Sequence, residues 1–106
     1  MKKNLYAIYD RKSNTYENYQ WQDVNDDCAY RTVNEIVNTI APNKLNQAPE
    51  DYTLYRLGTI DLETGIIEPK VEFLKNVIEF KRPVDKDKLE MLEKIDELKK
   101  AIMGVK

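Results

Sequence analysis

The residue types that most often carry out chemistry are scarce in this chain of 106 residues, which has no histidine and one cysteine, Cys28. Histidine is the commonest general base and metal ligand near neutral pH. Its absence excludes a Ser-His-Asp triad and a Cys-His pair, and a structural zinc site is excluded as well. Cys28 has no partner for an intramolecular disulfide. We expect it to act as a small buried apolar side chain.

Carboxylates are the remaining candidates for catalysis or metal binding, and no pair of them stands out. Asp10, Asp61 and Glu63 fall at the ends of expected strands and could hold a divalent cation. They lack the spacing of a known metal-binding loop, and capping of turns explains them more simply. We therefore expect a protein that is not an enzyme and uses no metal or cofactor, with catalysis by carboxylates as the remaining alternative.

Aromatic residues beside arginines give a stronger functional signal. Two strands that we predict to be neighbours have Arg11 and Arg56 close by in the sequence and carry the tyrosines Tyr6, Tyr9, Tyr52 and Tyr55. Rings on a sheet can stack the bases of a single-stranded nucleic acid while guanidinium groups meet its phosphates. Tyrosines in ordinary core positions are the alternative. With the aromatic residues of an exposed hairpin, the candidate nucleic-acid-binding residues are Tyr9, Arg11, Lys12, Tyr16, Tyr19, Trp21, Tyr55 and Arg56.

The overall charge does not favour a protein that binds phosphates over its whole surface. Lys and Arg number 17 against 19 Asp and Glu, which gives a net charge of −2. A nucleic-acid contact would therefore depend on a local patch, on stacking, or on an oligomer that concentrates a patch. The pairs Lys2-Lys3, Arg11-Lys12 and Lys81-Arg82 could converge at one end of the sheet, or could form ordinary solvated surface.

The first half of the chain predicts a hairpin followed by a helix. Residues 5–9 are apolar on both faces, which is typical of a central strand, and residues 15–21 predict a more exposed strand that returns beside it. Asp23 is the expected N-cap of a helix that ends near Ala41, because Pro42 disfavours a helical residue before it. Its apolar stripe comprises Ala29, Val33, Ile36, Val37 and Ile40.

The second half predicts a long strand over residues 52–61 and a turn at residues 62–65, with Gly65 in the left-handed conformation. Residues 66–68, 71–74 and 77–80 are also β-prone, and whether they form one bent strand or separate strands is left open by Pro69. The expected fold class is α+β: a mostly antiparallel sheet of four or five strands with one packed helix. We assign residues 1–82 to this domain.

Residues 83–106 predict a charged, amphipathic C-terminal helix. Its apolar positions alternate by steps of three and four, the pattern of a coiled-coil seam, with Lys88 at one core position. Two interpretations stay open: the helix packs back on its own sheet, or it joins copies of the chain into an oligomer. The residues expected at such an oligomer interface are Met91, Ile95, Leu98 and Ile102.

Two segments together resemble a known viral family. Residues 4–12 begin Asn-Leu-Tyr-Ala-Ile-Tyr-Asp, and residues 49–61 contain Glu-Asp-Tyr-Thr-Leu-Tyr-Arg-Leu-Gly and are followed by Glu63-Thr64-Gly65. With the intervening helix they resemble the small nonstructural, DNA-associated protein of gokushoviruses, the single-stranded DNA phages of the Microviridae. The resemblance implies a non-catalytic phage protein made in the host bacterial cytoplasm. It further implies a role in genome synthesis or packaging through DNA binding.

Two hypotheses about function follow. In the first, the protein binds single-stranded DNA and acts as a homo-oligomer formed through the C-terminal helix, which raises avidity. In the second, it is an interaction module that docks on a viral replication or capsid protein, or on a host factor, without touching nucleic acid. The apolar run after Met1 is too short to span a bilayer, so we expect no membrane contact.

Overall fold

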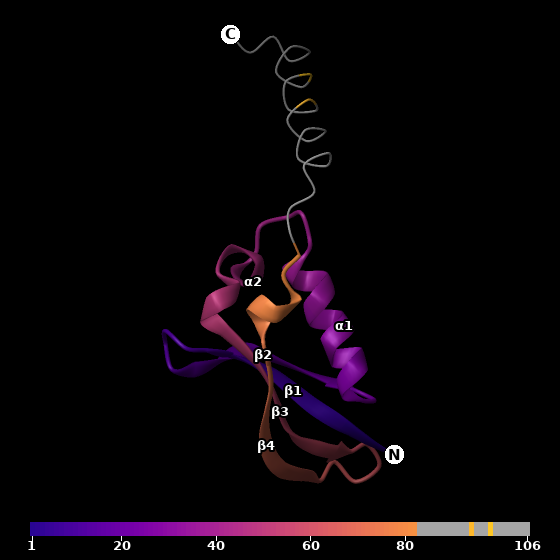
Figure 1. Ribbon diagram of the computed structural model, residues 1–106. Helices are drawn as coiled ribbons and strands as arrows, with labels where there is room; N and C mark the ends of the chain where they lie inside the picture. The colour runs from indigo at the N-terminus through magenta and orange to yellow at the C-terminus, as the bar shows by residue number, and fades with distance from the viewer. Residues whose placement is uncertain (83–93, 95–97, 99–106) are drawn as a thin grey trace.

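The computed structural model describes residues 1–82 together with Lys94 and Leu98. Its four strands form one antiparallel sheet in the order β2-β1-β3-β4. The strands are β1 (Lys2–Asp10), β2 (Thr15–Asp23), β3 (Tyr52–Asp61) and β4 (Ile67–Asn76), and the helices are α1 (Asp26–Val37), α2 (Lys44–Gln47) and the 3-10 turns η1 (Pro49–Asp51) and η2 (Val77–Phe80). Helices α1 and α2 and the turn η2 all lie above the sheet in Figure 1. The predicted α+β class is therefore confirmed for this part of the chain.

Strand β1 lies between β2 and β3, as its apolar residues on both faces predicted. Tyr6 and Ile8 point to the side of the sheet that carries α1, and both are buried. We call this side the helix face. The alternate residues Leu5, Ala7 and Tyr9 lie on the opposite side, which we call the open face because no helix of residues 1–82 covers it.

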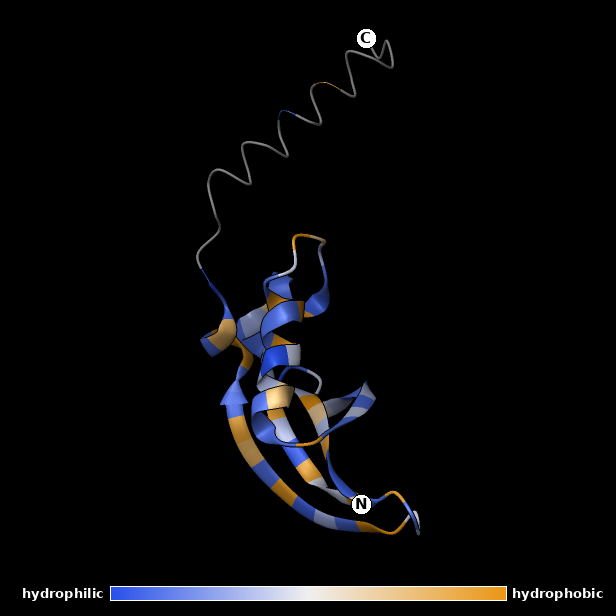
Figure 2. Cartoon of the chain, turned by 90° about the vertical axis from the view of Figure 1, so that its right-hand side faces the viewer, coloured by the Kyte–Doolittle hydropathy of each residue, from blue (hydrophilic) through white to orange (hydrophobic). Residues whose placement is uncertain are grey.

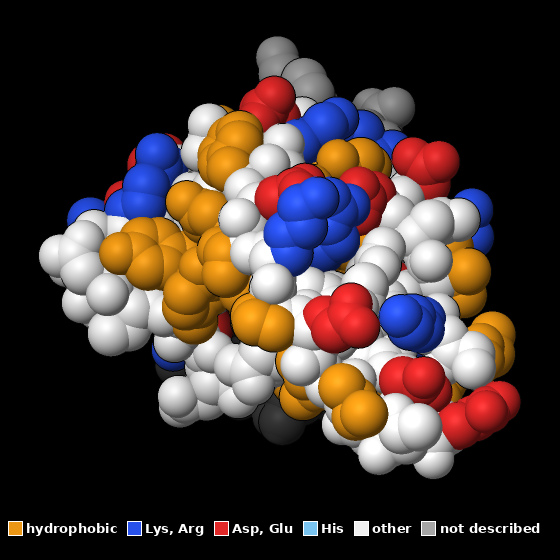
Figure 3. All heavy atoms as spheres, turned by 90° about the horizontal axis from the view of Figure 1, so that it is seen from below, with side chains coloured by type: hydrophobic (Ala, Val, Ile, Leu, Met, Phe, Trp, Pro, Cys, Tyr) orange, Lys and Arg blue, Asp and Glu red, His pale blue; other side chains and the backbone are white. Residues whose placement is uncertain are grey.

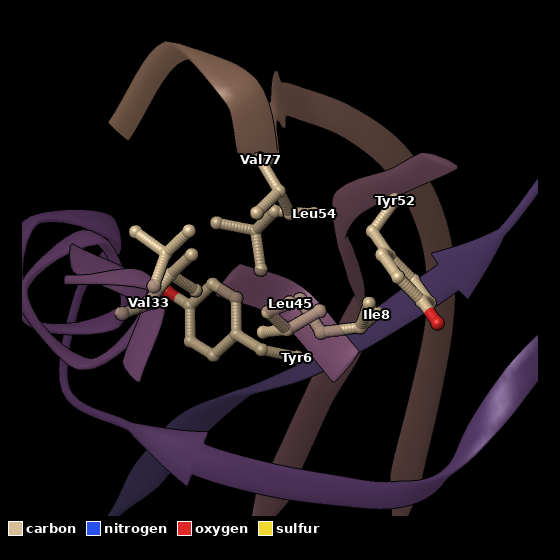
Figure 4. Packing of buried hydrophobic residues seen from close by; sticks show 9 residues of the cluster. Tyr6, Ile8, Val33, Leu45, Tyr52, Leu54 and Val77 are labelled. Atoms are coloured by element: carbon tan, nitrogen blue, oxygen red, sulfur yellow. The ribbon is translucent and has the colours of Figure 1, made fainter. Parts of the chain in front are cut away.

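The hydrophobic core fills the space between the helix face and the helices (Figure 4). Tyr6, Ile8 and Leu54 of the sheet meet Val33 of α1 and Leu45 of α2. The buried residues that complete the core are Ala29, Val37, Tyr52 and Val77. Burial of such side chains is the main force that holds α1 on the sheet, since each removes apolar surface from water.

Helix α1 begins later and ends earlier than the sequence predicted. Asn25, not Asp23, is the N-cap: its side-chain oxygen accepts a hydrogen bond from the Cys28 amide at 3.0 Å. Asp23 cannot take that role because it still belongs to β2, where it pairs with Asn4. The last helical residue is Val37, so the predicted extension to Ala41 is wrong.

Asn38 ends the helix and also fixes the end of the domain. Its side-chain amide donates to the carbonyl oxygens of Asn34 and Phe80, both at 2.9 Å, and its side-chain oxygen accepts from the amide of Arg82. These bonds compete with continuation of the helix. The connector that follows is not simply polar loop, because Asn43 and Asn46 cap the short helix α2 reciprocally and Leu45 is buried.

The segment after Gly65 is one strand rather than two. Strand β4 runs through Pro69, which is tolerated because β4 lies at the edge of the sheet. Its pairing with β3 is irregular between Leu54 and Tyr55 and again between Arg56 and Gly58. Figure 2 shows the alternation of hydrophilic and hydrophobic residues along β4. Residues 77–80, predicted as β-prone, instead form the 3-10 turn η2, which places Val77 in the core.

Two glycines have backbone conformations that other residues rarely adopt. Gly65 has φ 76°, which confirms the predicted left-handed turn between β3 and β4. Gly58 has φ 153°, and a Cβ atom built on it would lie 2.1 Å from the backbone oxygen of Glu68 on β4. A side chain at this position would therefore push the two strands apart.

The predicted C-terminal helix falls mainly on residues that the structure does not describe. Met91, Ile95 and Ile102 of the expected oligomer interface, and Lys88, lie outside the described residues. Leu98 is described, and its side chain is exposed. The division into a domain over residues 1–82 and a helix over 83–106 stays a prediction.

We predict that Gly58→Ala destabilises the fold by at least about 2 kcal/mol, because the new Cβ meets β4 backbone that cannot rotate away. Gly65→Ala is the matched control. It meets nothing within 4 Å, so it should cost only about 1 kcal/mol for its left-handed backbone. Urea denaturation of both variants measures the difference, and equal losses would contradict the close approach at Gly58.

Candidate nucleic-acid interface

Four aromatic rings, one from each strand, lie in contact on the open face. Tyr16 of β2 pairs directly with Tyr9 of β1, and Tyr55 of β3 pairs directly with Phe73 of β4. The two pairs meet diagonally, with Tyr9 and Tyr55 ring centroids 5.9 Å apart. The other centroid distances are 5.1 Å for Tyr9–Tyr16, 5.7 Å for Tyr16–Tyr55 and 6.0 Å for Tyr55–Phe73. We call these residues the aromatic row.

The rings of the aromatic row pack edge to face. Interplanar angles range from 68° for Tyr9–Tyr55 to 82° for Tyr16–Tyr55. This arrangement is the favoured one for aromatic pairs because the positive ring edge meets the negative ring face. Tyr55 contacts three other rings and stands at the middle of the row. The outer rings are more open: Tyr16 is 36% exposed and Phe73 55% exposed.

Charge is divided sharply between the two faces of the sheet. By the alternation of paired residues, every carboxylate carried by the four strands belongs to the helix face: Asp10, Glu17, Asp23, Asp61, Glu68 and Glu72. Contacts within that face agree, since Glu17 pairs with Lys44 and Glu72 with Arg56. In Figure 3 hydrophobic side chains gather in the left half of the view, while Asp and Glu lie mostly toward the centre and right. None of the carboxylates carried by the four strands thus lies on the open face.

Basic residues flank the aromatic row along β1. Lys3 lies on the open face, as Tyr9 does. The backbone amide of Arg11 donates to the carbonyl oxygen of Asp51 at 2.9 Å, which continues the pairing of β1 with β3 by one residue. Alternation along the chain therefore places Arg11 on the open face as well. Lys12, in the turn after β1, forms an ion pair with Asp51 at 3.3 Å. Since Lys2-Lys3 and Arg11-Lys12 lie at opposite ends of β1, the basic pairs do not form one patch.

Two of the predicted candidates lie on the other side of the sheet. Tyr19 stacks on Trp21 with their planes 11° apart, and Trp21 in turn stacks on the buried Tyr6. The indole nitrogen of Trp21 donates to Asp23 at 2.9 Å. The pairing of β2 with β1 shifts register between Tyr16 and Gln20. Tyr16 therefore faces the opposite side of the sheet from Tyr19 and Trp21. The exposed hairpin therefore contributes Tyr16 to the open face and both Tyr19 and Trp21 to the helix face, rather than a single cluster.

Arg56 also lies on the helix face, inside a polar network. The Tyr6 hydroxyl donates to Asp26 at 2.7 Å, and Arg56 pairs with Asp26 at 2.6 Å and with Glu72. Asn4 donates to the Tyr6 oxygen at 3.0 Å. Arg56 is thus occupied by two carboxylates, and the structure places it away from the aromatic row.

The network changes the acidity of its members. Burial, with the hydrogen bond to Asp26, raises the pKa of the Tyr6 phenol well above its ordinary value. The hydrogen bond to Asp26 likewise raises the pKa of Arg56. A hydrogen bond from Lys70 and the charge of Arg56 lower the pKa of Glu72. Near neutral pH Tyr6 therefore stays protonated and neutral, Arg56 stays positive and Glu72 stays negative, and the network ties α1 to β1, β3 and β4.

Phe73 is the member of the aromatic row that the sequence did not single out. Its position depends on the pairing of β4 with β3, and that pairing is irregular both between Phe73 and Lys75 and between Pro69 and Glu72. The available signal was the alternation of Val71 and Phe73 with Glu72, which predicts one face for both apolar side chains.

Comparison with known proteins gives one match. Residues 3–80 match the model of the family described as Phage ORF5 protein. Searches of curated proteins and of solved structures find no match. The matched segment contains the whole aromatic row.

The described part of the chain was also compared with the requirements of a metal site and of a membrane-spanning helix. No group of His, Cys, Asp and Glu there has the geometry to hold a metal ion. No helix among those residues combines the length and apolar character needed to cross a membrane.

We predict that Glu72→Gln lowers the melting temperature at pH 7, and that this loss shrinks as the pH falls below about 4. Glu72 has a lowered pKa when folded, so its charged form stabilises the protein above the unfolded pKa. That stabilisation is lost as the pH falls through the folded pKa. Thermal unfolding followed by circular dichroism between pH 3 and 7 tests this, with the exposed Glu35→Gln on α1 as control. A loss that stays constant over this range would contradict the role of the charge.

Proposed function

Since the chain belongs to the phage ORF5 protein family, we propose that it is a non-catalytic phage protein that binds single-stranded DNA on its open face. The observation that carries the proposal is the aromatic row, which crosses all four strands on a face without strand carboxylates. Stacking on aromatic rings suits single strands because every base has a flat face and only unpaired bases can reach the rings.

The charge distribution supports this proposal despite the net charge of −2. A strand bound across the aromatic row would meet Arg11 near Tyr9, while the strand carboxylates lie on the opposite face of the sheet. Repulsion of phosphates falls with distance and with salt, so carboxylates on the far face weaken binding less than their number suggests. We propose the host cytoplasm as the place of action, where a replicating phage genome is found.

A second candidate function is docking of a protein partner, for which a different observation speaks. Away from the aromatic row, the open face continues into exposed aliphatic residues of β4, with Ile67 56% and Val71 60% exposed. Exposed apolar surface of this kind often marks protein contacts. A viral replication or capsid protein is the partner class that we propose for this candidate. An absence of DNA binding at any salt concentration would favour this candidate.

We predict that a fluorescein-labelled oligothymidylate of twelve nucleotides binds the full chain at low salt and dissociates as salt rises. Arg11→Gln should weaken binding and reduce the slope of log K against log salt by about 0.7, the value for one phosphate contact on a single strand. Arg31→Gln, an exposed arginine of α1, is the matched control and should change neither quantity. Fluorescence anisotropy measures both. Equal effects of the two variants would mean that the contact is not on the open face.

We further predict that the emission of Trp21 stays unchanged when the oligonucleotide binds. The indole lies on the helix face, between Tyr6 and Tyr19, and a strand on the open face cannot stack on it. Strong quenching on binding would place the contact at Tyr19 and Trp21 and would overturn the assignment to the open face. Tyrosine emission, excited at shorter wavelength, provides the positive comparison.

A further inference from the structure

Resting on the proposed function, we infer that the open face takes about four nucleotides of a single strand and stacks bases on the two outer rings, Tyr16 and Phe73, while Tyr9 and Tyr55 act as positioning residues. The four rings thus have two different roles, and the ligand has a defined length and is single-stranded.

Strand position and exposure separate the two roles, because Tyr9 and Tyr55 lie on the central strands β1 and β3, whereas the exposed Tyr16 and Phe73 lie on the edge strands. Tyr55 has neighbouring rings on three sides, at 5.7 to 6.0 Å, and these contacts use its edges and faces. Tyr9 is held between Tyr16 and Tyr55. Phe73 contacts Tyr55 within the row and is otherwise 55% exposed at the edge strand, which leaves ring surface for a base. Tyr16 occupies the opposite edge strand, is 36% exposed, and is braced by both inner rings.

The length of the ligand follows from the length of the aromatic row. Tyr55 lies 5.7 Å from Tyr16 and 6.0 Å from Phe73, so the two outer ring centroids are at most about 12 Å apart. A stacked strand advances about 3.4 Å per nucleotide, and about four nucleotides therefore span the row. An extended strand would cover it with fewer. Longer oligonucleotides gain no further ring.

The strandedness follows from access to the base faces. In a duplex each base is already stacked on its neighbours and paired with its partner, so an interior base presents no free face to Tyr16 or Phe73. Unpairing would cost free energy that two stacking contacts do not recover fully. Arg11, two residues after Tyr9 in the chain, offers a phosphate contact that either form of DNA could use, but without the rings it gives only weak, nonspecific attraction.

The test uses the full chain and fluorescein-labelled oligothymidylates of two, four, six and eight nucleotides. Affinity should rise steeply up to about four nucleotides and then increase only slightly, as more registers become available. A duplex of eight base pairs should bind at least about tenfold more weakly than its single strand. Affinity that climbs evenly to eight nucleotides, or equal binding of duplex, would overturn the inference while leaving the proposed function standing.

Variants distinguish the outer from the inner rings. Tyr16→Leu and Phe73→Leu should each weaken binding of the four-nucleotide strand about fivefold or more, the loss expected for one stacked base. Tyr16→Phe keeps the ring and should bind nearly as well as the natural chain. Tyr19→Leu, at a tyrosine that is 67% exposed on the helix face, is the control and should have no effect. Circular dichroism confirms that each variant is folded.

The possible outcomes distinguish failure of DNA binding itself from failure of the roles assigned to the rings. No binding of any oligonucleotide at any salt concentration overturns the proposed function and this inference together. Binding that is insensitive to Tyr16→Leu and Phe73→Leu overturns the inference alone. Loss in Tyr16→Phe as large as in Tyr16→Leu would show that the hydroxyl, rather than the ring, makes the contact, and would also overturn it.

Discussion

The hydrogen-bonded link between Tyr6, Asp26 and Arg56 fastens the first turn of α1 to the face of the sheet on which the core holds the helix. It joins β1 and β3 to the first turn of α1, where the carboxylate also lies favourably near the positive end of the helix. Breaking such a partly buried link leaves a phenol and a guanidinium without their partner, which costs more than the contact itself contributes. The core residues then pack behind it, and the other face of the sheet stays uncovered within residues 1–82.

This one-sided arrangement reconciles an acidic protein with the proposed binding of single-stranded DNA. Net charge describes the whole molecule, whereas a bound strand experiences the charges nearest to it. Alternation along each strand sends side chains to opposite faces, and here it sends the carboxylates to one and the aromatic row to the other. The ion pairs of the helix face also neutralise part of that negative charge, since Glu72 meets both Arg56 and Lys70.

Sequence patterns predicted the order of the main elements because local signals determine them. Strand β3 matched its predicted bounds, and β1 was recognised as central from apolar residues on both faces. The errors arose where local signals compete: Asp23 and Asn25 are both good caps, and only pairing with Asn4 shows that Asp23 belongs to a strand. The aromatic row was found in part. Tyr9, Tyr16 and Tyr55 were predicted, but irregular pairing hid Phe73 and the separation of Tyr19 and Trp21 onto the other face.

The irregular edges of the sheet affect the tendency of the protein to aggregate. An uncovered apolar face beside two straight edge strands would invite growth of the sheet from one molecule to the next, as in amyloid. Strand β4 lacks an amide proton at Pro69 and is distorted on both sides of Glu72, while β2 is irregular near Tyr16. These distortions remove the regular ladder of free backbone groups that a neighbouring strand needs. The protein can therefore keep its apolar face open for a ligand without its edges acting as a template for polymerisation.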